Sequence, residues 1–185
     1  ATIVPGSEVV LDRIGINPTR TGILTILQRM GADISVTPQS TDGEPTGRLT
    51  VRSAELMGTD VGGAEIPLAI DELPLIALAA CFAEGTTVIA DAEELKRKES
   101  DRIAVVVDSL RSLGAEIEAT GDGMVIEGTG GLRGGTIASH GDHRIAMLGA
   151  VAGIASDKGA SVFDMDAASV SYPTFKSDLS ALLRT

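Results

Sequence analysis

Residues 101–118 read DRIAVVVDSLRSLGAEIE, and residues 21–35 read TGILTILQRMGADIS. In both stretches the apolar residues recur with the 3.6-residue period of an amphipathic helix. A glycine, Gly31 or Gly114, follows each helical run and precedes a short segment that is typical of a strand. The chain therefore repeats a helix–glycine–strand element, which predicts an α/β fold.

A second repeated element is a helix followed by a short glycine turn and a strand. One copy reads IDELPLIALAACFAEGTTVI at residues 70–89. The other reads GDHRIAMLGAVAGIA at residues 141–155 and continues as GASVF at 159–163. Asp71 and Asp142 occupy matching positions in the two copies, where each is expected to cap its helix.

With further strands expected at 47–53 and 123–127, the repeating unit is strand–helix–strand–helix–strand–strand. Residues 1–4 match the strand at 86–89, but no helix precedes them, and no strand follows the helix expected at 173–183. No linker-like or low-complexity segment divides the chain. We therefore expect residues 1–185 to form one domain of a longer protein.

The amino-acid composition excludes several classes of protein. The 185 residues carry a formal net charge of −11, 43% of them are hydrophobic and 2% are aromatic. This balance argues against a nucleic-acid surface. The apolar stretches fall far short of the ~20 residues that cross a bilayer, and no signal peptide is expected. The single cysteine, Cys81, lies in an apolar helical pattern, which favours burial over reactivity. We expect a cytoplasmic domain without a membrane partner.

Polar residues concentrate where three of the expected helices begin. Helix N-termini leave backbone N–H groups unpaired and carry partial positive charge, so they attract anions. One of these starts, LKRKESDR at residues 95–102, holds four basic residues, and Glu99 lies one turn before Arg102. Such a cluster could bind phosphate or carboxylate groups while Glu99 transfers a proton. The alternative is a solvated charge run in which Ser100 caps the helix and Glu99 pairs with Arg102.

At the start near residue 142, His143 and Arg144 lie in the first helical turn. A cation there opposes the helix dipole, which suggests a bound anion; the alternative is an exposed arginine tolerated at small cost. His140 and His143 are three apart, but no further ligands are evident, so we predict no metal site. Asp71, at the third helix start, is expected to be an ordinary helix cap. Its match to Asp142 in the repeat predicts that both residues lie near one end of the fold.

Four motifs together resemble the C-terminal signature set of the EPSP synthases, the 3-phosphoshikimate 1-carboxyvinyltransferases. They are DELP at residues 71–74, KESDRI at 98–103, DHRIAM at 142–147 and SYPTF at 171–175. Their order and separations also fit, and the resemblance covers essentially the whole chain. The wording resembles the bacterial class II form, of the glyphosate-tolerant kind.

The resemblance implies an inside-out α/β barrel of repeated β-α-β-α-β-β units, one of two such domains in an enolpyruvyl transferase. Residues 1–185 would be the C-terminal domain, with the N-terminal domain absent. The implied reaction moves the enolpyruvyl group of phosphoenolpyruvate to the 5-hydroxyl of shikimate 3-phosphate and releases phosphate. Both substrates would bind between the domains, and neither a cofactor nor a metal is implied.

By the same resemblance, two acids carry the proton transfers. Asp71 would take the proton of the attacking hydroxyl, and Glu99 would exchange a proton at the methylene carbon. Lys98 would contact the substrate and the reacting centre. The remaining substrate contacts would come from Arg102, His143 and Arg144, with the two arginines clamping phosphoenolpyruvate through their planar donors.

One departure from the family pattern lies near the end of the chain. Many members have a lysine three residues before the proline of the final motif, where this chain has Val170. Lys176 follows that motif and is not a substitute. Because the first-domain residues that grip shikimate 3-phosphate are also absent, we expect no turnover from this polypeptide alone.

Three other interpretations remain. A UDP-N-acetylglucosamine enolpyruvyl transferase shares the fold and chemistry, but it lacks the KESDRI wording. A non-catalytic half-domain that binds ligand weakly is the behaviour expected of the isolated chain. A solenoid-like interaction module is disfavoured because charge gathers at the helix starts.

Overall fold

The computed structural model describes residues 1–183. The strands are β1 (Glu8–Gly15), β2 (Asp33–Ser40), β3 (Thr46–Arg52), β4 (Asp60–Val61), β5 (Glu84–Ile89), β6 (Glu116–Ala119), β7 (Met124–Thr129), β8 (Gly135–Ala138) and β9 (Ala160–Phe163). The α-helices are α1 (Gly22–Arg29), α2 (Ile66–Ala69), α3 (Leu73–Cys81), α4 (Arg102–Ser112), α5 (His143–Ala155) and α6 (Phe175–Leu182). Short 3-10 helices are η1 (Pro18–Arg20), η2 (Gly63–Glu65), η3 (Glu93–Arg97) and η4 (Met165–Val170).

The expected repeating unit is present in full once, as β4-α3-β5-α4-β6-β7. Its sheet has the order β4-β5-β7-β6, with β4 parallel to β5 and the other two pairs antiparallel. The segment β1-α1-β2-β3 repeats the second part of the unit, because its antiparallel sheet has the matching order β1-β3-β2. The segment β8-α5-β9 repeats the first part, with β8 parallel to β9.

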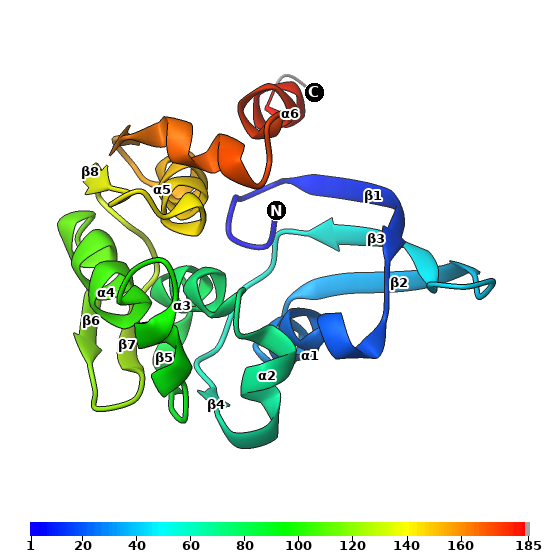
Figure 1. Ribbon diagram of the computed structural model, residues 1–185, viewed down its shortest axis with the longest axis horizontal. Coiled ribbons are helices and arrows are strands. Elements are labelled where there is room, and N and C mark those ends of the chain that lie inside the picture. Colours follow the sequence, from blue (N-terminus) through cyan, green and yellow to red (C-terminus); the bar gives the residue numbers. More distant parts are fainter. Residues whose placement is uncertain (184–185) are drawn as a thin grey trace.

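Helices fill the interior of this fold and sheets lie outside. Helix α3 is apolar on all sides, and eight of its nine residues are buried, as expected of a helix enclosed on all faces. Figure 1 shows α3 near the centre, with the β1–β3–β2 sheet to one side and β5, β6 and β7 to the other. One apolar core joins side chains from α1, α3, α4 and α5 to the inner faces of the strands.

The glycines that were expected to end two of the helices do so. Gly31 follows α1 with φ 99°, and Gly114 follows α4 with φ 100°. Only glycine adopts this left-handed conformation without steric cost, so each residue turns the chain from its helix into the next strand. Both helix–glycine–strand predictions are confirmed.

Three local predictions were wrong. Residues 1–4 form a turn, in which the Val4 N–H donates to the Ala1 carbonyl at 3.2 Å, and not a strand. Asp71 does not cap α3, because its carboxylate pairs with two arginines instead. Asp101, rather than Ser100, caps α4 by accepting from the Ala104 N–H at 3.1 Å. The Asp142 cap is confirmed, since its carboxylate accepts from the Arg144 N–H at 2.9 Å.

Cys81 lies at the end of α3 and is fully buried, as expected. Burial raises the pKa of its thiol to about 12, so it packs as an apolar side chain. Within residues 1–183, no helix has both the length and the apolar character that crossing a membrane requires.

Candidate functional site

The three polar helix starts meet at one end of the helical core. Asp71 precedes α3, Glu99 and Arg102 lie at the start of α4, and Asp142 and Arg144 lie at the start of α5. Ion pairs join all five side chains into one network. The proximity of Asp71 and Asp142 that the repeat predicted is thereby confirmed.

Arg102 is the centre of this network and is only 1% exposed. Its Nε donates to Asp142 Oδ2 at 2.8 Å, and its Nη1 donates to Asp71 Oδ1 at 3.3 Å. Its Nη2 donates to Glu99, which confirms the ion pair that the alternative interpretation gave between these residues. A buried guanidinium is tolerable only when its charge is paired, and here three carboxylates surround it.

Asp142 is the buried counter-ion of Arg102 and is 0% exposed. Burial by itself raises the pKa of this carboxyl, but hydrogen bonds from Arg102, Ser100 and the Arg144 backbone N–H outweigh it, so the pKa of Asp142 is lowered. The Ser100 hydroxyl donates to Oδ2 at 2.9 Å. One ionised side chain therefore caps α5 and holds Arg102 in place.

Arg144 lies beside Asp71 at a more open position. Its Nη2 is 2.9 Å from Asp71 Oδ2, and its Nη1 donates to the Asp71 carbonyl at 3.3 Å. The negative charge expected near this arginine is thus supplied within the chain by a carboxylate. Asp71 bridges Arg102 and Arg144, so it links α4 and α5 to the start of α3.

Lys98 and His143 lie at the edge of the network. Lys98 Nζ pairs with Glu94 Oε1 at 2.9 Å, and His143 Nδ1 is 3.8 Å from Glu99 Oε1. Among residues 1–183, no three His, Cys, Asp or Glu side chains gather as a metal-binding group. At the chain's last motif, Val170 is exposed on η4 and Lys176 pairs with Asp166 at 2.6 Å.

A cavity of about 310 Å³ adjoins the network next to Asp71. Glu72 also lines it and lies 4.0 Å from Arg144 Nη1. Burial raises the pKa of the Glu72 carboxyl, although Arg144 acts in the opposite direction. The cavity therefore holds one carboxylate engaged with arginines and another that ionises less readily than usual.

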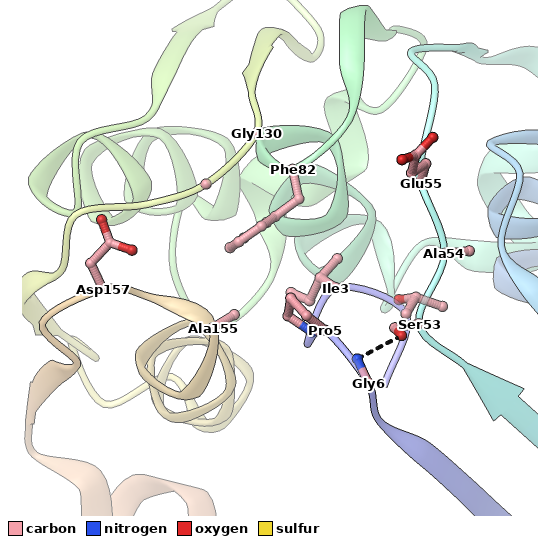
Figure 2. A pocket seen from close by; sticks show the side chains of 12 residues that line it. Ile3, Pro5, Gly6, Ser53, Ala54, Glu55, Phe82, Gly130, Ala155 and Asp157 are labelled. Atoms are coloured by element: carbon pink, nitrogen blue, oxygen red, sulfur yellow. Dashed lines mark hydrogen bonds between the residues drawn. The ribbon is translucent and has the colours of Figure 1, made fainter.

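A larger cavity, of about 620 Å³, lies at the opposite end of the inner helices (Figure 2). Phe82, just after α3, and Ala155, the last residue of α5, line it together with Glu55 and Asp157. None of the residues predicted for the site lines it. The larger cavity and the network of charged side chains thus lie at opposite ends of the inner helices. We take the end with the charged network as the candidate site.

Sequence reasoning missed the wider role of Asp142, as well as Ser100, Glu72 and Glu94. Asp142 was treated as a cap, although its match to Asp71 was a signal of a shared position. Ser100 was considered only as a cap. Glu94 and Lys98 are four residues apart, the spacing at which opposite charges pair on a helix, so this ion pair was predictable once the short helix η3 was expected.

The match to known families is extensive. The sequence model of EPSP synthase (3-phosphoshikimate 1-carboxyvinyltransferase) matches residues 1–179. The chain belongs to the EPSP synthase family. The 3-phosphoshikimate 1-carboxyvinyltransferase of Bacillus cytotoxicus is 51% identical over 181 residues, which cover 97% of this chain and 43% of that relative. The enzyme of the same name from Geobacter sulfurreducens is 53% identical over 176 residues, covering 95% of this chain and 41% of that relative.

Solved structures agree with this family. An EPSP synthase from Acinetobacter baumannii superposes with a TM-score of 0.91 at 42% identity, over 96% of this chain and 42% of that one. The enolpyruvyl transferase NikO from Streptomyces tendae has a TM-score of 0.75 at 19% identity, which supports the fold alone. The inside-out α/β fold of the EPSP synthases is therefore confirmed. The chain spans less than half the length of the relatives that it matches.

Proposed function

We propose that residues 1–185 are the C-terminal domain of a two-domain 3-phosphoshikimate 1-carboxyvinyltransferase of the bacterial class II form, acting in the cytoplasm. The enzyme transfers the enolpyruvyl group of phosphoenolpyruvate to the 5-hydroxyl of shikimate 3-phosphate and releases phosphate. The observation that carries this proposal is the meeting of Asp71, Glu99, Arg102 and Arg144 at one end of the inner helices. The N-terminal domain supplies the opposite wall of the cleft.

The proposed reaction is an addition followed by an elimination. The substrate hydroxyl attacks C2 of phosphoenolpyruvate and gives its proton to Asp71, while Glu99 donates a proton to the methylene carbon. The tetrahedral intermediate then loses a methyl proton back to Glu99 as the bond to the phosphate oxygen breaks, and the proton held by Asp71 passes to the leaving phosphate. Two acid–base groups amid fixed positive charge are sufficient for these steps.

The arginines of the site stabilise the anionic groups of phosphoenolpyruvate. Arg144 is the more accessible of the two, and its present partner is Asp71. An arriving carboxylate or phosphate that displaces Asp71 from Arg144 leaves an Asp71 oxygen able to accept the hydroxyl proton. Arg102 stays anchored by Asp142 and directs its Nη groups toward Asp71 and Glu99.

Lys98 and His143 complete the proposed substrate contacts. Lys98 exchanges its ion pair with exposed Glu94 for the substrate, which costs little because surface pairs contribute only about 0–1 kcal/mol. His143 lies close enough to Glu99 to influence its proton transfer. Neither role needs a metal or a cofactor.

A chimera tests the function directly. In it, this chain replaces the matched 43% of the Bacillus cytotoxicus relative. We expect phosphate release from the chimera when both substrates are present, and none above the no-protein blank from the chain alone. An inactive but folded chimera would contradict the proposed function, and turnover by the isolated chain would contradict the need for a second domain.

Variants of the chimera test the assignment of the two acids. Asp71→Asn and Glu99→Gln should each lower kcat by about 100-fold or more, because general acid–base catalysis contributes about 10²–10⁴-fold. The binding of phosphoenolpyruvate should change far less. Asp108→Asn, an exposed acid of α4, is the matched control. Full kcat in both site variants would show that the roles are misassigned.

The substrate is tested in the same assay. UDP-N-acetylglucosamine in place of shikimate 3-phosphate should give no phosphate, because the motifs of this chain resemble the EPSP synthases. Turnover with that nucleotide sugar would favour the related transferase instead.

A further inference from the structure

Arg20 forms part of the wall of the 310 Å³ cavity beside Asp71. It ends the short helix η1, just before α1, and lines the cavity together with Thr19, Asp71 and Glu72. The volume lies at the lower end of the range of small-molecule sites, about 300–1,000 Å³. Neither the polar helix starts nor the proposed roles account for this cation.

Two features fix the backbone that carries Arg20. Asn17 Oδ1 accepts from the Thr19 N–H at 3.0 Å, and the Arg20 N–H donates to the Asn17 carbonyl at 2.8 Å. Gly22 packs directly on α2, where an added Cβ would lie 2.6 Å from the Leu68 carbonyl oxygen. These contacts fix the backbone at Arg20, so only side-chain freedom is lost when the arginine binds a ligand.

The three arginines near the cavity differ in the number of carboxylates with which they form ion pairs. Arg102 is held by three carboxylates, and Arg144 is held by Asp71. Within residues 1–183, the exposed guanidinium of Arg20 has no ion pair and no hydrogen bond, and it acts on Glu72 only through longer-range attraction. Of these three arginines, Arg20 can accept an anion without first releasing a carboxylate.

The internal repeat places Arg20 at a position that matches the first turn of α4. When Gly31 is aligned with Gly114, Thr19 falls opposite Arg102 and Arg20 falls opposite Ile103. The short helix η1 thus matches the start of α4, and each of these two segments presents an arginine beside Asp71, one buried and one exposed. The second arginine lies on the cavity side, where a ligand can reach it.

We infer that Arg20 is a further substrate-binding residue, which receives a carboxylate or phosphate group in the cavity beside Asp71. This inference rests on the proposed function for the identity of the anion, since both substrates carry such groups. Arg20 binds the anionic group and takes no part in proton transfer. Its removal therefore weakens substrate binding and leaves the chemical step largely unchanged.

Calorimetric titration of the chimera with each substrate separately tests this inference. Arg20→Gln should weaken the binding of phosphoenolpyruvate or of shikimate 3-phosphate by about tenfold or more, as loss of a charge-assisted hydrogen bond predicts. Arg20→Lys should fall between wild type and Arg20→Gln, because it keeps the charge but loses the planar fork. Lys158→Gln, which removes an exposed cation before β9, should bind both substrates as wild type does.

The outcomes separate this inference from the proposed function. Wild-type affinity of Arg20→Gln for both substrates would overturn the role of Arg20, whatever the activity of the chimera. An equal loss in Lys158→Gln would also overturn it, because the effect would then be one of net charge. A chimera that binds a substrate through Arg20 without releasing phosphate would contradict the proposed function and support Arg20. Unfolding midpoints equal to wild type in all variants show that the fold is intact.

Discussion

The carboxylate of Asp142 serves two parts of the molecule at once. Its Oδ1 accepts from the first turn of α5, and its Oδ2 accepts from Arg102 and Ser100 at the start of α4. A single side chain therefore fixes the relative position of two helices whose N-termini carry the proposed active-site residues. Replacing it affects both the stability of the fold and the direction of the Arg102 donors.

We predict that Asp142→Asn lowers the free energy of unfolding by about 3 kcal/mol, because Arg102 loses its fully buried counter-ion and keeps only the two partly exposed carboxylates of Asp71 and Glu99. Chemical denaturation of the chain measures this loss. Asp108→Asn, on the exposed side of α4, is the control and should stay within about 0.5 kcal/mol of wild type. A similar small change in Asp142→Asn would mean that Arg102 does not depend on it.

The lowered pKa of Asp142 also predicts how the difference in unfolding free energy between wild type and Asp142→Asn depends on pH. A carboxyl whose pKa is lower in the folded state contributes stability above its unfolded pKa, and this contribution is lost as the pH falls through the folded value. The difference in unfolding free energy between wild type and Asp142→Asn should be constant above about pH 5 and shrink below about pH 4. A difference that grew on acidification would contradict the assignment of Asp142 as an ionised counter-ion.

Individual residues also show what could be predicted from sequence. The motifs indicated Asp71, Glu99, Arg102 and Arg144, and the structure brings these four together. The Glu99–Arg102 ion pair, within one helix start, was foreseen, but the ion pairs between different helix starts could not be predicted, because they depend on distances between separate elements. Arg102 is a case in point, since the alternative interpretation placed it in a solvated charge run, whereas it is almost fully buried.

At the scale of the elements, the glycine that precedes strand β7 allows the chain to pack closely against the end of β5. A Cβ on Gly123 would lie 1.9 Å from the Ile89 carbonyl oxygen, a backbone atom that cannot move aside without breaking the sheet. The tight turn from β6 to β7 therefore depends on the absence of a side chain, not on an unusual backbone conformation, since the φ of this glycine is not positive.

We predict that Gly123→Ala destabilises the chain by about 3 kcal/mol or more, at the upper end of the range for overpacking. Gly121 lies in the same turn with no atom within 4 Å of its added Cβ, so Gly121→Ala is the matched control and should be near neutral. Thermal unfolding of the two variants gives the comparison. Equal midpoints would mean that the turn can relax around the new methyl group.

The elements were predictable to different degrees. Helices α1, α3, α4 and α5 were expected from their apolar period and their terminal glycines. The bounds of the short strand β4 and the existence of the helix η4 were not predicted, because elements of two to six residues carry too little periodicity to be distinguished from loops. The repeat compensated in part, since it fixed the order of strands and helices that no single segment could establish.

At the scale of the whole molecule, strand β9 differs from β5, the strand that occupies the same place in the complete repeating unit. In the complete unit, β5 pairs with β4 on one side and with β7 on the other. Strand β9, the equivalent of β5, pairs only with β8 among the described residues. By register, Phe163 matches Ile89, yet Phe163 is 73% exposed whereas Ile89 is 0% exposed. Strand β9 thus has one edge without a partner strand among the described residues, and it carries a large exposed apolar side chain.

We predict that the isolated chain self-associates through this edge, because an exposed apolar edge strand is a template for pairing with another chain. Sedimentation velocity over a range of concentrations should show association of the wild-type chain. Phe163→Asp should weaken it by at least about tenfold, the effect of ~1.4 kcal/mol on an equilibrium constant. Val170→Asp is the control, since Val170 is 80% exposed but lies on η4 instead of a sheet edge. If Val170→Asp disrupted association as strongly, general surface hydrophobicity would explain it, and β9 would have no special role.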